Sequence, residues 1–87
     1  MEKINEATIN IIKDEITNLK AGNKPSRSGD LYACESDIAD RVFSYDRWNN
    51  AEYKAISKEM QAIWQAQGQN QARVYYLETL LNAISKI

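Results

Sequence analysis

Residues 24–29 hold the densest group of side chains in the chain that can bind an anion. They lead into a predicted helix, and the free N–H groups and dipole of a helix N-terminus attract phosphate. Lys24, Ser26, Arg27 and Ser28 would add charged and hydroxyl donors, whereas the neighbouring Asp30 would repel an anion. The GxxxxGK[ST] order of a phosphate-binding loop is absent. The segment from Gly22 to Asp30 therefore carries a nucleotide-binding hypothesis beside a simpler interpretation, a solvated connection between helices.

The other reactive side chains do not form a catalytic or metal-binding pattern. The chain has no histidine and a single cysteine, Cys34, so the usual groups for acid–base catalysis and for zinc are missing. Cys34 lies between Leu31 and Ile38 on an apolar seam, which favours an inert buried thiol. Four acids are close in sequence but point in several directions around a helix: Glu35, Asp37, Asp40 and Asp46. We expect no enzymatic activity, no metal and no cofactor.

The charge is nearly balanced overall but uneven along the chain. The 87 residues carry a net charge of −1, which disfavours binding to nucleic acid. Residues 30–46 contain five acids and one arginine, so a helix there would present an acidic face. One cysteine permits no intrachain disulfide, and no segment has the apolar length of a signal peptide or a membrane span. We therefore expect a cytoplasmic protein without membrane contact.

The apolar spacing predicts an all-α fold and contains no β-strand pattern. A single domain over residues 1–87 is expected, with helices at about 4–20, 31–45, 50–67 and 70–87. Gly22 is the expected stop of the first helix, and Ser28 or Asp30 the expected cap of the second. Asn49 and Glu52 resemble a capping box for the third helix. These elements predict a small three- to four-helix bundle with antiparallel neighbours.

The polar segment 65–71 leaves the connection between the last two helices open. Gly68 favours a turn there, which would make a helical hairpin. The alternative is one long bent C-terminal helix, because the helical register continues through Gln67 and Gln71.

The third predicted helix has an apolar seam opposite a row of alanines. We expect the seam to be buried, together with Tyr45 at the end of the second helix. The alanine row is interpreted as a solvated face built from good helix formers. The seam consists of Tyr53, Ile56, Met60, Ile63 and Trp64.

The last predicted helix has a wider apolar face than a surface helix needs. Its apolar residues cover roughly 180° of the helical wheel, whereas a stripe of about 100° suffices for a helix on a monomer. This helix is therefore expected either at the centre of the fold or in contact with another chain. Trp48, at the probable corner 46–49, is either a partner contact or a plug for the corner. The expected partner-binding residues are Trp48, Tyr75, Tyr76, Leu80, Ala83 and Ile87.

These patterns favour a small interaction protein that binds another protein or itself, as a homodimer or larger oligomer. Accessory inhibitors, immunity factors and adaptors are common functions for proteins of this size. The first alternative is a nucleotide-binding protein that uses the loop from Gly22 to Asp30. The second is a small DNA-binding regulator with a helix-turn-helix over 31–45 and 50–67. It is disfavoured because its second helix offers only Lys54 and Lys58 as cations.

Overall fold

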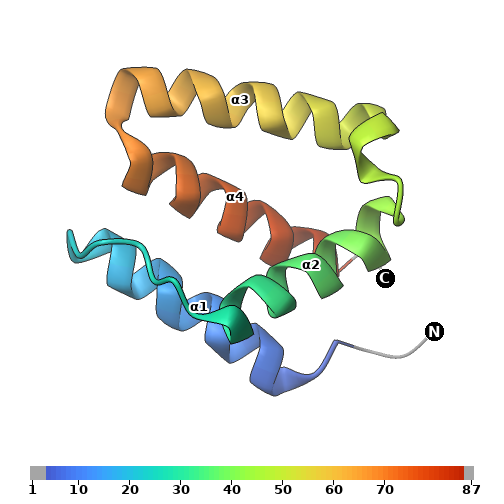
Figure 1. Ribbon diagram of the computed structural model, residues 1–87, viewed down its shortest axis with the longest axis horizontal. Coiled ribbons are helices and arrows are strands. Elements are labelled where there is room, and N and C mark those ends of the chain that lie inside the picture. Colours follow the sequence, from blue (N-terminus) through green and yellow to red (C-terminus); the bar gives the residue numbers. More distant parts are fainter. Residues whose placement is uncertain (1–3, 86–87) are drawn as a thin grey trace.

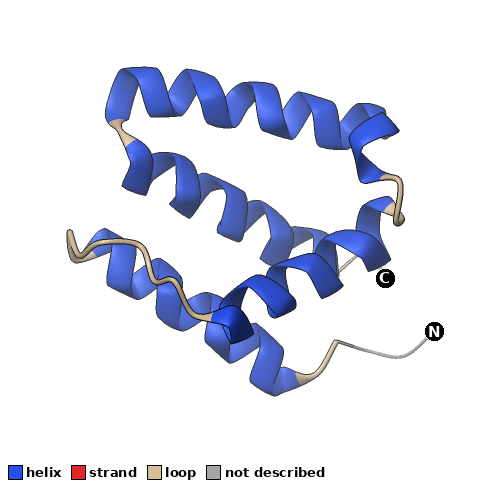
Figure 2. Ribbon diagram, in the orientation of Figure 1, coloured by secondary structure: helices blue, strands red, loops and turns tan. Residues whose placement is uncertain are grey.

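The computed structural model describes residues 4–85, and this range is helical throughout apart from short connections (Figures 1 and 2). No strand occurs in the described residues, so the predicted all-α fold class is confirmed. The elements are α1 (Glu6–Lys20), α2 (Gly29–Phe43), the 3₁₀ turn η1 (Arg47–Asn49), α3 (Ala51–Gln67) and α4 (Gln69–Ile84).

Helix α4 is the central element, in contact with each of the other three helices. Figure 1 shows it between α3 and α1, with α2 crossing beside it. This position accounts for its wide apolar face, because different sides of α4 meet different neighbours. Its buried residues are Ala72, Val74, Tyr76, Leu77, Leu80 and Ala83.

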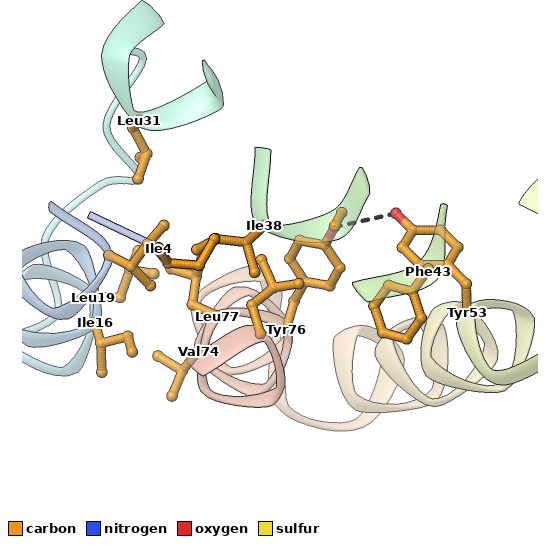
Figure 3. Close-up of a cluster of buried hydrophobic side chains, with 13 residues drawn as sticks. Ile4, Ile16, Leu19, Leu31, Ile38, Phe43, Tyr53, Val74, Tyr76 and Leu77 are labelled. Carbon is orange, nitrogen blue, oxygen red and sulfur yellow. Dashed lines mark hydrogen bonds between the residues drawn. The ribbon is translucent and has the colours of Figure 1, made fainter. Parts of the chain in front are cut away.

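The core is built mainly by α1, α2 and α4. Ile12, Ile38, Leu77 and Leu80 are its largest fully buried side chains. Among the described residues, α3 contributes one buried member, Tyr53, whose hydroxyl lies 3.2 Å from that of Tyr76 (Figure 3). Helix α3 is therefore attached to one side of the core and is not enclosed by it.

The helix ends follow local rules, with one shift from the expected positions. Gly22 has φ 87°, a conformation that glycine adopts without steric cost, and α1 ends just before it as predicted. Ser28 occupies the N-cap position of α2, although its side chain makes no capping hydrogen bond. Asn50, rather than Asn49, caps α3 by accepting a hydrogen bond from the Tyr53 N–H at 3.1 Å. Asn49 belongs to η1 instead and donates its side-chain amide to Asp46.

Helix α2 ends two residues earlier than the apolar spacing indicated. Ser44 has φ 78° and ψ 167°, which is not helical, so the chain leaves the α2 axis after Phe43. Tyr45 then points into solvent and is 89% exposed. The prediction that Tyr45 belongs to the core is wrong for this reason.

Gly68 separates α3 from α4. Its φ of 97° and ψ of 175° reverse the chain in a single residue and make an antiparallel helical hairpin. The expected turn is confirmed, and the alternative of one continuous rod is not the arrangement in this structure.

Candidate interaction surface

Most of the expected partner contacts on the C-terminal helix lie inside the monomer. Tyr76 is 8% exposed, Leu80 is fully buried and Ala83 is 6% exposed. These three side chains belong to the core, so they are not a surface that a partner can reach while the monomer is folded. Tyr75 is half-buried, and Ile87 lies outside the described residues.

The corner between α2 and α3 holds a packed aromatic cluster with one exposed edge. Trp48 and Phe43 both make edge-to-face contacts with Tyr53, at ring-centroid distances of 5.1 and 5.4 Å. The Arg47 guanidinium lies within 6 Å of the Trp48 and Tyr53 rings, at 5.8 and 5.7 Å. Trp48 therefore covers Tyr53, as expected of a corner plug, yet 63% of it stays exposed.

Tyr76 forms the inner, buried end of this aromatic cluster. The Tyr76 hydroxyl is removed from water and paired with the Tyr53 hydroxyl. Burial, and then this hydrogen bond, raise the pKa of Tyr76 above its ordinary value. A neutral, hydrogen-bonded tyrosine at this depth stabilises the contact between α3 and α4.

The acids of α2 do not form the open acidic face that their sequence spacing suggested. Asp37 pairs with Arg41 at 3.1 Å, and Asp40 pairs with Arg47 at 2.6 Å. Glu35 is buried and receives two hydrogen bonds of 2.8 Å from Arg73 of α4. The hydrogen bond to Glu35 raises the pKa of Arg73. Three of the five acids in residues 30–46 are thus neutralised by arginines, and the described residues contain no cluster of metal-binding side chains.

The loop before α2 is held down by an internal carboxylate. Glu15 of α1 is 5% exposed and accepts hydrogen bonds from the Ser26 N–H at 2.9 Å and the Asn18 side chain at 3.0 Å. The Ser28 N–H donates to the Ser26 hydroxyl. The Ser26 and Ser28 N–H groups, which could have bound an anion, therefore already donate hydrogen bonds within the protein.

The side chains of the same loop still border an open depression. Lys24, Ser26 and Arg27 line it with Tyr32 of α2, around a volume of about 850 Å³. Lys24 and Arg27 are exposed, and 56% of Tyr32 is exposed. Of the predicted anion-binding residues, Ser28 does not line this depression but a neighbouring one with Ser26 and Leu31.

The C-terminal half of α3 is more exposed than its apolar seam indicated. Within the described chain, Tyr53 is the only buried residue of α3. Trp64, on the same apolar seam of α3, is 53% exposed. Ile56 and Met60 pack against the core, whereas Ile63, almost two turns beyond Ile56, is half-buried and not in contact with the core cluster. The prediction that Trp64 is a core residue is therefore wrong, because α3 packs mainly on α4 and η1.

Sequence reasoning missed this surface because the seam of α3 has regular helical spacing along its whole length. The spacing shows which side of a helix is apolar, but not how many neighbours cover it. The one available signal was the polar composition around Gly68, directly after Trp64, which indicates that the end of the helix is solvated.

Comparisons of the chain with protein-family models, with curated proteins and with solved structures give no match. Across residues 4–85, none of the helices combines the length and apolar character needed to traverse a bilayer.

Proposed function

We propose that this chain is a small, non-enzymatic interaction module that binds a protein partner through the C-terminal half of α3. The observation that carries the proposal is the exposure of Trp64 beside Ile63, on a helix that packs mainly on α4 and η1. Tryptophan is among the residues that most often dominate interface energetics. Inhibitor, immunity and adaptor functions all fit a protein that acts through such a surface.

The energy available from this surface supports the proposal. A tryptophan side chain buries about 150–250 Å². The exposed half of Trp64 would then remove about 80–130 Å² from water, which contributes about 2–3 kcal/mol. That amount corresponds to a hot spot in a protein–protein interface.

Native mass spectrometry of the protein and its Trp64→Ala variant, recovered gently from cells, tests the proposal. We expect the parent to carry a protein partner and the variant to lose it, with unchanged helical circular dichroism. Tyr45→Ala is the matched control, because Tyr45 is more exposed and lies outside α3. Retention of the partner by Trp64→Ala, or equal loss in both variants, would refute a binding surface on α3.

A second candidate, binding of an anionic nucleotide, is favoured by the depression beside the loop. Lys24 and Arg27 would meet the phosphates, and the exposed ring of Tyr32 offers a face on which a base can stack. Because the Ser26 and Ser28 N–H groups already donate within the protein, side chains would supply most of the contacts.

Isothermal titration with ATP and ADP separates this candidate from the first. The double variant Lys24→Ala, Arg27→Ala should weaken binding, whereas Lys54→Ala, Lys58→Ala removes the same charge from exposed positions on α3 and should not. The absence of binding to the parent protein, or an equal effect of both variants, would eliminate it. A cytoplasmic location belongs to the main proposal and rests on the single free thiol, Cys34, which is typical of reducing compartments.

A further inference from the structure

One residue, Gly68, separates the two long helices α3 and α4. The Gly68 N–H bonds to the Trp64 carbonyl at 2.9 Å, and the Gly68 carbonyl accepts from the Ala72 N–H at 3.3 Å. Helical hydrogen bonding therefore reaches Gly68 from both sides. A helical Gly68 would let three further N–H groups, those of residues 69–71, bond to the carbonyls of residues 65–67.

The surroundings of Gly68 place no obstacle to a straight helix. A Cβ added at Gly68 would meet no atom within 4 Å. Gln65, Gln67, Gln69 and Gln71 are all exposed, so a continuous helix here would bury no polar side chain. The positive φ of Gly68 is the local feature that separates the hairpin from a rod of residues 51–84.

We propose that two copies of this chain exchange α4, forming a dimer in which α3 and α4 of each copy are one continuous helix. A short hinge favours this kind of exchange, because the dimer repeats the contacts of the monomer and changes only the hinge. Helix α4 suits the exchange because it contacts α1, α2 and α3. The two rods would lie antiparallel, with α3 of one copy against α4 of the other, as in the hairpin.

The reach of the chain shows which segment must move. If α4 stayed with its own α1 and α2, a straightened α3 would begin roughly 50 Å from the far end of α4. Helix α2 ends near that far end, since Phe43 and Ala83 line one small depression. The seven residues 44–50 span at most about 25 Å. Helix α3 therefore stays with α1 and α2, and α4 crosses to the second copy.

Several contacts that lie within one chain would then join two chains. They include the two hydrogen bonds between Arg73 and Glu35, at 2.8 Å each, and the bond between the Tyr53 and Tyr76 hydroxyls. The Asn70 side chain donates to the Leu19 and Asn23 carbonyls at the end of α1, and these two hydrogen bonds would also join the two chains.

The first test is Gly68→Ala. Alanine is disfavoured at the positive φ of the hairpin and favoured in the rod, and together these effects shift the equilibrium toward the rod about 30- to 900-fold per chain. After unfolding and refolding at high concentration, we expect a species of twice the 10.0 kDa chain mass by light scattering. Gly29→Ala is the control, because Gly29 lies in the first turn of α2 without a positive φ; this variant should keep the monomer–dimer ratio of the parent chain. A Gly68→Ala chain that stays monomeric would overturn the proposal.

The second test uses the ion pair between α2 and α4. Glu35→Arg and Arg73→Glu each place two like charges together in a monomer, so each variant alone should be strongly destabilised. In an exchanged heterodimer of the two variants, both lobes regain an opposite-charge pair. We expect the two chains to fold together when co-refolded in the Gly68→Ala background, as a 1:1 dimer by native mass spectrometry.

The chain that carries both Glu35→Arg and Arg73→Glu is the control for the pair itself, since it restores the pair within a monomer. A folded double variant together with an unrescued mixture would contradict α4 exchange. Dimerisation of Gly68→Ala without rescue in the mixture would also contradict it, because that result indicates surface docking between intact hairpins.

Discussion

The buried ion pair between Glu35 and Arg73 leads to a quantitative prediction for stability. Glu35 is 9% exposed and Arg73 17% exposed at their side chains, and Arg73 donates two hydrogen bonds to the carboxylate. Arg73→Met keeps much of the apolar stem but leaves the carboxylate buried without a cation. Loss of one partner from such a pair costs about 3–5 kcal/mol. That is a large part of the roughly 4–13 kcal/mol expected for 87 residues.

The assay is urea unfolding followed by circular dichroism. With an m-value of about 1.5 kcal/mol per M, Arg73→Met should lower the midpoint by about 2–3 M. The matched control is Lys20→Met, which breaks an exposed pair with Glu78 at 3.5 Å, with side chains 58% and 49% exposed. An exposed pair contributes about 0–1 kcal/mol, so its midpoint should fall by less than about 0.7 M.

The double variant Glu35→Gln, Arg73→Met separates the lost attraction from the buried charge. It leaves neither ion alone, so we expect it to be more stable than Arg73→Met by itself. Equal costs for Arg73→Met and Lys20→Met, or a double variant as unstable as the single one, would refute the reasoning that burial makes this pair important.

Three further predictions follow from single residues. Ser44 has φ 78° and ψ 167°, a region adopted almost only by glycine at a cost of about 1–3 kcal/mol for other residues, so Ser44→Gly should raise the melting temperature by several degrees in a thermal scan. Asn50→Ala should cost about 1 kcal/mol in urea unfolding because it removes the α3 cap, whereas Asn49→Ala should cost less than half as much; a larger effect at Asn49 would contradict the capping geometry. Burial raises the pKa of Tyr76, so the unfolded chain binds fewer protons than the folded one once the pH exceeds about 10, and stability should fall there. Tyr76→Phe should flatten that alkaline loss in unfolding experiments between pH 8 and 11, and an unchanged slope would exclude Tyr76 as its origin.

Much of the secondary structure could be predicted from local sequence signals. The four helices lie within about two or three residues of their expected ranges because apolar spacing, Gly22 and Gly68 act over a few residues. The exceptions are also local. Ser44 adopts an unusual backbone conformation that its residue type does not predict, and Asn50 caps α3 because Asn49 belongs to η1.

The candidate surface was predicted less well because it depends on how many helices cover each apolar face. Trp48 is partly exposed at the corner and Tyr75 is half-buried, but the other described contacts expected on α4 are internal. The exposed patch at Ile63 and Trp64 is instead on the helix whose seam had been assigned to the core.

By itself, the sequence determined that the chain is all-α, where its helices begin and end, and which side of each helix is apolar. These properties follow from hydrogen bonding and side-chain spacing within a few residues. Only the tertiary structure decided that α4 is central and that Arg73 neutralises Glu35, 38 residues away. The exposure of Trp64 to solvent was also decided only by the tertiary structure. The physical reason is that an apolar face has no preference for one apolar partner over another, so coverage is set by the packing order of the helices.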